Sequence, residues 1–222
     1  LKGMLGAPPI QFTLADMEAL HVDPSRFLGN PKNIQRVNEM PSRLALNDRL
    51  IHSAVTKAIV DRYRARYERV PAYWDLMEHV ISAMIRGEEM TFAAHGVLRT
   101  GKECIYLPNG MKLNYRGLER SDDGSASYFD GRKRTHVYGG LLTENITQCL
   151  HRLIVCAQML EISQVLKVAL MRHDDVVCVV PEDAAEAAMQ YMMQVMSTTP
   201  AWATGLPLAG EGGIGRTLLE AK

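Results

Sequence analysis

The sequence predicts an α+β fold, in which helical elements precede an antiparallel sheet with packed helices. Two observations support this class. Apolar residues recur at helical spacing from Pro41 to about Gly87 and again from Leu142 to Leu160. Two other stretches, around Pro108 and around Asp174, have the strand–turn–strand pattern of β-hairpins. Because strands joined by tight turns pair antiparallel, the sheet is expected to be antiparallel.

The helical first part contains two predicted helices. Their apolar positions recur every three or four residues, as one face of an α-helix requires. These positions are Leu46, Leu50, Ala54, Val55, Ala58 and Ile59, then Trp74, Met77, Val80, Ile81, Met84 and Ile85. Pro71 is expected to separate the two helices. Because Trp74 lies on the apolar stripe, its position favours the core over stacking on bases.

A β-hairpin is predicted between Gly96 and Tyr115. The stretch GVLRTGKECIYLPNGMKLNY alternates apolar with polar residues and has Pro-Asn-Gly in its middle, which favours a tight turn. The next stretch, RSDDGSASYFDGRKR at residues 120–134, is rich in Ser, Asp and Gly. We therefore expect a loop there.

The last part predicts a long amphipathic helix, a second hairpin and a third helix. The hairpin joins a strand at residues 167–171 to one at 176–180, and its valines predict strands covered on both sides. The stretch EDAAEAAMQYMMQVMS at residues 182–197 begins with acids, which favour a helix N-terminus, and its methionines favour core packing over a ligand site. The Gly- and Pro-rich tail from Pro200 is expected to end in a short edge strand.

Composition is that of a soluble protein with a sizeable core. The 222 residues are 47% hydrophobic, with 25 basic and 25 acidic side chains. No apolar run approaches the roughly 18 to 20 residues of a membrane helix, so no membrane partner is expected. The four cysteines form no CxxC pair, which favours buried thiols in a reducing compartment, the cytoplasm.

Charge is uneven along the chain. Residues 137–222 have five basic and nine acidic side chains, whereas residues 1–136 have 20 basic and 16 acidic ones. Within the first part, positive charge is concentrated at residues 61–69 and 131–136. Contact with phosphates and a solvated arginine face both explain these clusters.

Two adjacent acids, Asp174 and Asp175, follow His173 in the turn of the predicted second hairpin. Asp is common in β-turns, so a plain turn explains them. A carboxylate held rigidly between two strands also suits a divalent metal such as Mg²⁺. One such turn does not complete a catalytic site, because two-metal phosphoryl transfer needs ligands from several elements around metals about 3.5–4 Å apart.

Four stretches, in their order and spacing, resemble the C-terminal part of family A DNA polymerases, particularly the phage branch. They are GKECIYLPNGMKLNY, THVYGGLLTENITQCLHR, MRHDDVVCVVPED and PAWATGLPLAGEG. The resemblance spans most of the chain. It implies template-directed addition of deoxynucleotides to a primer by two-metal phosphoryl transfer. It also implies two parts, a helical fingers-like portion at residues 1–90 and a palm-like portion with the catalytic hairpin at residues 91–222.

The resemblance also implies roles for the hairpin residues. In the family the turn between two palm strands has the sequence His-Asp-Glu, whose Asp binds the catalytic metals and whose His lies beside the primer terminus. Asp174 is therefore expected to be catalytic and to bind Mg²⁺, and His173 to contact DNA. Asp175 takes the place of the usual Glu as the second catalytic acid, with a shorter side chain.

The helix that contains TENITQ is similar to the family helix that contacts the minor groove of the primer-template. There, amide side chains meet base acceptors that are common to all four base pairs. Glu144, Asn145 and Gln148 match this pattern, and Arg152 follows one turn later. We expect these residues to bind DNA. The opening LKGMLGAPPIQF resembles the glycine-rich end of the fingers helix that closes over the nucleotide.

Two parts of the family's site have no counterpart in the sequence. Nothing resembles the first palm motif, which supplies the other metal-binding Asp, or the Arg, Lys and Tyr that hold the incoming triphosphate. We therefore expect this chain to be inactive alone. The missing parts would come from upstream residues or from a second polypeptide. Primer-template DNA and deoxynucleoside triphosphates are the other expected partners, and the host cytoplasm is the expected location if the protein is viral.

Two other classes stay open. A metal phosphohydrolase also uses His-Asp, but it places the pair on a helix among further histidines, and the remaining histidines show no ligand spacing. A noncatalytic DNA-binding or scaffold module that retains a palm fold would explain the missing motif. The acid retained at Asp174 argues against that module.

Overall fold

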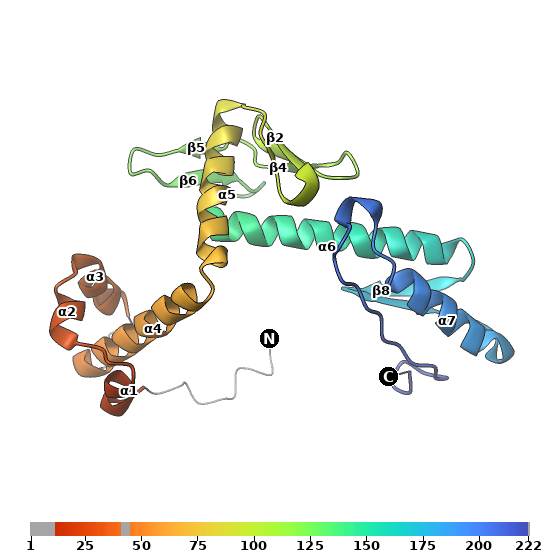
Figure 1. Cartoon of the computed structure of the whole chain (residues 1–222), viewed down its shortest axis with the longest axis horizontal. Coiled ribbons are helices and arrows are strands. Elements are labelled where there is room, and N and C mark those ends of the chain that lie inside the picture. Colours follow the sequence, from red (N-terminus) through yellow and green to blue (C-terminus); the bar gives the residue numbers. More distant parts are fainter. Residues whose placement is uncertain (1–11, 41–44, 222) are drawn as a thin grey trace. The chain divides into compact units, whose positions relative to one another are not determined.

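The computed structural model describes residues 12–40 and 45–221. The chain divides into two compact units, unit 1 at Leu1–Ala72 and unit 2 at Tyr73–Lys222. Figure 1 shows that unit 1 is built from helices, whereas unit 2 contains both helices and strands.

Unit 1 contains four helices in its described part: α1 (Leu14–Ala19), α2 (Pro24–Leu28), α3 (Pro31–Glu39) and α4 (Leu46–Arg66). The three short helices begin at capping side chains. Thr13 and Asp16 form a capping box, Asp23 accepts bonds from the backbone of Ser25 and Arg26, and Asn30 accepts one from Lys32. A small core joins these helices to α4, and it consists of Met17, Phe27, Val37, Ile51, Ala54 and Val55.

The first part of unit 2 contains α5 (Arg69–Arg86), which begins just before the unit boundary, and two antiparallel sheets. Sheet A has the order β1 (Thr91–Phe92), β2 (Leu98–Gly101), β3 (Cys104–Tyr106) and β4 (Lys112–Asn114). A short 3₁₀ helix, Ala94–Gly96, connects β1 to β2. Sheet B has the order β5 (Glu119–Arg120), β6 (Ala126–Phe129) and β7 (Arg134–Val137).

The second part of unit 2 begins with the long helix α6 (Gly139–Ser163). A two-stranded sheet follows, β8 (Val168–Arg172) with β9 (Asp175–Cys178), and then a 3₁₀ turn, Glu182–Ala184, that leads into α7 (Ala185–Met196). Another 3₁₀ turn, Ala201–Ala203, starts the tail. Figure 1 shows α6 extending from α5 and the first two sheets to β8 and α7.

The main core of unit 2 lies between α5, sheets A and B and the first half of α6. Its fully buried side chains include Met77, Ile81, Leu98, Tyr115 and Leu142. Burying aliphatic side chains of this size stabilises a fold by about 1.5–3 kcal/mol each. The core therefore fixes the N-terminal half of α6, the half that contains Glu144, Asn145 and Gln148.

The predicted α+β class is confirmed, with antiparallel sheets and packed helices. The Pro-Asn-Gly hairpin is β3–β4, the helix expected from Leu142 to Leu160 lies within α6, and the second hairpin is β8–β9. Pro71 does not separate the two helices, because it lies within the first turn of α5, where a missing N–H costs little.

Three other predictions were wrong. Residues 120–134 are not a loop, because Asp123 and Asp130 organise two tight turns and the residues between them form β6. The strands β8 and β9 are not covered on both sides, since Leu170 is 45% exposed and Val179, just beyond β9, is 63% exposed. No strand occurs in the described tail, residues 197–221.

The unit boundary lies at residues 72 and 73, before the predicted change from a helical to a mixed portion at residue 90. The two divisions differ because α5 is helical in sequence but packs with the strands that follow it. Met77, Val80 and Met84 of α5 belong to the same core as Leu98 and Ile105 of sheet A. The fingers-like and palm-like assignments of the two portions stay predictions.

Candidate functional site

The β8–β9 hairpin exposes all three of its predicted site residues. Arg172 pairs with Asp175, so His173 and Asp174 form a two-residue turn between the strands. His173 has a φ of 53°, in the left-handed region that tight hairpin turns use. Asp175 is therefore the first residue of β9 and not part of the turn, which corrects the expectation that both acids occupy it.

The two acids occupy different backbone settings. Adjacent residues of an extended strand point to opposite faces, whereas a turn residue projects beyond the end of the ladder. Asp174 is placed at the tip, and Asp175 is placed opposite Arg172 in the ladder. The two carboxylates are thus expected to differ in what they can reach.

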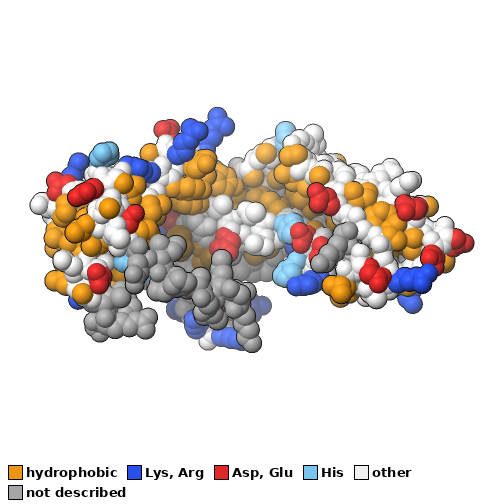
Figure 2. All heavy atoms as spheres, turned by 90° about the horizontal axis from the view of Figure 1, so that it is seen from below, with side chains coloured by type: hydrophobic (Ala, Val, Ile, Leu, Met, Phe, Trp, Pro, Cys, Tyr) orange, Lys and Arg blue, Asp and Glu red, His pale blue; other side chains and the backbone are white. Residues whose placement is uncertain are grey.

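The hairpin offers only part of a metal site. Within residues 12–40 and 45–221, no group of three or more His, Cys, Asp and Glu side chains is arranged to hold a metal ion. Figure 2 shows the acidic side chains of the C-terminal part scattered among hydrophobic ones on the face in view. Carboxylate oxygens suit Mg²⁺, so Asp174 fits as one ligand of such an ion, and further ligands are needed to complete the shell.

A row of exposed side chains lies on one face of α6. We call it the polar α6 face, and it consists of Glu144, Thr147, Gln148, His151 and Arg152. Their spacing of three and four residues places them on the same side of the helix, opposite the buried Leu142 and Ile146. Three of the four predicted DNA-binding residues of α6 therefore lie together in solvent.

Asn145, the fourth of these residues, has a different environment. It is partly buried, and its Nδ2 donates a hydrogen bond of 3.1 Å to the hydroxyl of Tyr115, which is 1% exposed. Burial raises the pKa of the Tyr115 hydroxyl, and the bond from Asn145 lowers it in part. Asn145 thus has a structural contact, and its predicted contact with DNA would use the remaining N–H and the carbonyl oxygen of the amide.

Arg152 connects the polar α6 face to the hairpin. Its Nη1 lies 3.8 Å from the Sδ of Met171, the residue of β8 that comes before Arg172. Strand β8 of the hairpin also packs against α6. The structure therefore brings the polar α6 face and the predicted catalytic hairpin to one part of unit 2.

No local sequence signal marks Tyr115 or Met171 as a support of the site. Tyr115 follows the Pro-Asn-Gly hairpin and is 30 residues from Asn145, so no local pattern connects the two. Met171 lies in an apolar run and carries no signal of an arginine contact. The roles predicted for Asp174, as Mg²⁺ ligand and catalytic acid, and for Asp175, as second catalytic acid, are not tested by any contact of the described residues.

The comparisons with known proteins give no family for this chain. No protein-family model matches it, and no curated protein and no solved structure matches it. Within the described residues, no helix has both the length and the apolar character that crossing a membrane requires.

Proposed function

We propose that this chain is the C-terminal part of a template-directed DNA polymerase, which adds deoxynucleotides to a primer by two-metal phosphoryl transfer. The observation that supports the proposal best is the arrangement of the β8–β9 hairpin beside the polar α6 face. Asp174, an exposed carboxylate, lies at the turn of a hairpin whose strand β8 contacts Arg152 of a helix face with amide, hydroxyl and basic side chains. Such a surface suits a primer terminus and the minor groove that leads to it.

The roles follow from the resemblance to family A polymerases. Asp174 would hold Mg²⁺, which would supply charge neutralisation for the transferred phosphoryl group. His173 would contact the primer end, and Glu144, Gln148 and Arg152 would contact the primer-template. Asp175 would act as the second, shorter acid of the hairpin. The substrates would be deoxynucleoside triphosphates, and the reaction would take place in the cytoplasm.

The site would be completed by another polypeptide or by upstream residues. The described part of the chain offers no further acid that is grouped with Asp174 and Asp175. Among residues 12–40 and 45–221, the β8–β9 sheet also has no third strand. A partner that supplies the first palm motif and the fingers helix would provide the missing acid and the residues that hold the triphosphate.

A noncatalytic DNA-binding or scaffold module with a palm fold is the second candidate. The incomplete set of carboxylates favours it, because two adjacent acids alone do not support two-metal catalysis. The two candidates predict different consequences of changing Asp174.

The test compares Asp174→Asn with Asp175→Asn in the complex of this chain and its complementary polypeptide. Asp174→Asn keeps the side-chain shape and removes one negative charge, so single-turnover primer extension should fall by at least about 10²- to 10³-fold. Asp175→Asn should be milder, because it lies in the strand. Primer-template affinity should survive both changes, since most of it comes from phosphate contacts elsewhere.

Equal and small losses of extension for the two variants would contradict the catalytic assignment and favour a plain acidic turn. Melting curves of both variants should match that of the parent, because His173, Asp174 and Asp175 are all exposed. Parent-like extension by Asp174→Asn in the reconstituted complex would leave the scaffold as the better account.

A further inference from the structure

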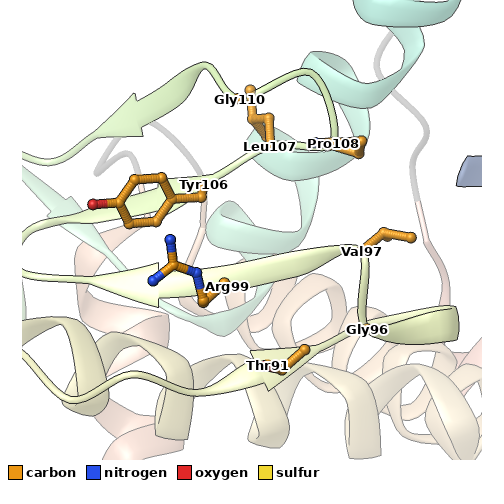
Figure 3. Close-up of a pocket in the computed structure, with 8 residues that line it drawn as sticks. All are labelled: Thr91, Gly96, Val97, Arg99, Tyr106, Leu107, Pro108 and Gly110. Carbon is orange, nitrogen blue, oxygen red and sulfur yellow. The ribbon is translucent and has the colours of Figure 1, made fainter.

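A groove of about 350 Å³ lies at one end of sheet A. Its floor is formed by β2 and β3, and its walls by the β1–β2 connection and the β3–β4 turn (Figure 3). Figure 3 shows Val97 and Pro108 at one end of the groove, and the side chains of Arg99 and Tyr106 near each other at the other end. The groove is therefore apolar at one end and cationic at the other.

Glycines fix both walls of the groove. Gly96 has a φ of +65°, and a Cβ there would lie 2.8 Å from Thr91 Cγ2, so only glycine allows this close approach. Gly110 has a φ of +83° and closes the β3–β4 turn with a bond of 2.9 Å from its N–H to the carbonyl of Leu107. The shape of the groove is thus built into the backbone.

Two cations flank the tyrosine on the outer face of sheet A. Strand pairing places Arg99, Tyr106 and Lys112 side by side on β2, β3 and β4. The Arg99 Cζ lies 4.2 Å from the centroid of the Tyr106 ring, and the Lys112 Nζ lies 4.8 Å from it. Cation–π contacts of this kind hold the two charges in place.

Both cations retain donors for a ligand. Arg99 pairs with Glu89 through Nη1. An arginine side chain has five N–H donors, so others lie outside this pair, and the Arg99 side chain is 42% exposed. Lys112 is exposed, and its ammonium group contacts the ring of Tyr106 and not an acid. Arg99 and Lys112 can therefore bind an anion across neighbouring strands.

The surroundings favour a polyanion. Residues 91–137, which form sheets A and B, contain eight basic and five acidic side chains, a net charge of 8 − 5 = +3. A phosphate ion would use the cations but not the apolar end at Val97, Leu107 and Pro108. A strand of nucleic acid has both the repeated charge and the flat apolar base that the two ends of the groove fit.

We infer that the outer face of sheet A binds single-stranded nucleic acid, with backbone phosphates on Arg99 and Lys112 and a base in the groove beside Val97 and Pro108. Tyr106 positions the two cations. This site is separate from the polar α6 face and the β8–β9 hairpin. The inference deepens the proposed function. It rests on that function in one respect, namely that the bound strand is single-stranded DNA next to the primer-template.

The test is fluorescence anisotropy with the whole chain and a fluorescein-labelled oligothymidylate of about 15 nucleotides. Arg99→Gln and Lys112→Gln should each raise Kd roughly threefold to tenfold and reduce the slope of log K against log salt by about 0.7. Lys167→Gln is the matched control, since Lys167 is an exposed lysine of the same unit outside sheet A. It should leave Kd and slope nearly unchanged.

An oligonucleotide of the same length without bases tests the groove itself. It should bind the parent several-fold more weakly, and Val97→Ser should remove most of that difference. Parent-like Kd and salt slope for Lys112→Gln, equal binding of the abasic strand, or no binding by the parent would each overturn the inference. If thymidine monophosphate competed with the labelled oligothymidylate as well, mole for mole, as unlabelled oligothymidylate does, the site would be a mononucleotide site. That result would also overturn the inference.

This assay contains no metal ion, triphosphate or second polypeptide, so its result does not depend on polymerase chemistry. Asp174→Asn should bind the oligothymidylate as the parent does. Loss of primer extension with intact oligonucleotide binding, or the reverse, would therefore separate a failure of the proposed function from a failure of this site.

Discussion

Asn145 connects the core of unit 2 to the candidate DNA-binding surface. Its amide donates a hydrogen bond to the buried Tyr115 hydroxyl, whereas Gln148, almost one turn later, is exposed and belongs to the polar α6 face. Tyr115 in turn packs edge-on against Tyr128 of β6, with ring centroids 4.9 Å apart. Two amides that appear equivalent in the TENITQ stretch therefore have different physical settings.

Alanine at these two positions should separate stability from DNA use. Asn145→Ala should lower the free energy of unfolding by about 1–3 kcal/mol, because it leaves the Tyr115 hydroxyl buried without its partner. Gln148→Ala should change it by less than about 0.5 kcal/mol, since an exposed side chain is removed. Both should raise the apparent KM for primer-template in the reconstituted complex, because Gln148 belongs to the polar α6 face and Asn145 lies next to it.

Urea denaturation of the whole chain measures the stability difference. Tyr115→Phe serves as the control, because removing the hydroxyl also removes the need for a partner. Asn145→Ala should then cost less in the Tyr115→Phe background than in the parent. Equal free energies of unfolding for Asn145→Ala and Gln148→Ala would contradict the structural role of Asn145.

At the scale of elements, α6 joins the main core to the hairpin. Its first residue, Gly139, donates a backbone hydrogen bond of 2.7 Å to Glu78 of α5, and Arg120 of β5 lies 3.6 Å from the same carboxylate. The second half of the helix buries Ile154, Val155 and Ile162, and Gln158 bonds to the carbonyl of Met196. The position of the hairpin thus depends on how α6 starts.

Gly139→Ala should disrupt this start. An added Cβ would overlap the backbone carbonyl of Trp74, and its carbonyl carbon would lie only 2.7 Å away, so the two helices must move apart. We expect a loss of about 1–3 kcal/mol or more in the free energy of unfolding. Gly140→Ala is the matched control, because its Cβ meets the movable Tyr138 ring at 3.0 Å and alanine has the higher helix propensity.

Thermal unfolding compares the two glycine variants directly. The Tm of Gly139→Ala should fall clearly below that of Gly140→Ala. A Tm for Gly139→Ala at or above the parent value would show that α5 and α6 are not packed as closely as described.

Local patterns predicted helices α4 to α7 and both hairpins, but not the short helices α1 to α3 or the arrangement of sheet B. The periodicity of residues 74–85 and the Pro-Asn-Gly turn need no tertiary information, and both appear in the structure. Sheet B was missed because Ser, Asp and Gly dominate residues 120–134, although Ala126 is buried in the main core and pairs with Val137. A short strand of this kind is stabilised by packing and not by its composition.

For the candidate site, the sequence predicted the hairpin and the helix but not their contacts. The Asn145–Tyr115 bond and the Arg152–Met171 contact join residues 30 and 19 positions apart, and neither has a local signature. The polar α6 face could be predicted from spacing once α6 was recognised. The groove on sheet A could not, because it requires the register of β2, β3 and β4.

At the scale of the whole molecule, we propose that the chain supplies one half of a catalytic site. The β8–β9 hairpin supplies adjacent acids, and the described part of the chain groups no further metal ligands with them. A second polypeptide with the first palm motif and the fingers helix should complete the site. Neither half should extend a primer alone.

Primer extension by this chain, by the complementary polypeptide and by their mixture tests that claim most directly. With a primed template, Mg²⁺ and all four deoxynucleoside triphosphates, we expect no extension by either polypeptide alone and clear extension by the mixture. The mixture with Asp174→Asn should be inactive. Robust synthesis by the isolated chain, or full activity of the mixture that contains Asp174→Asn, would contradict the account.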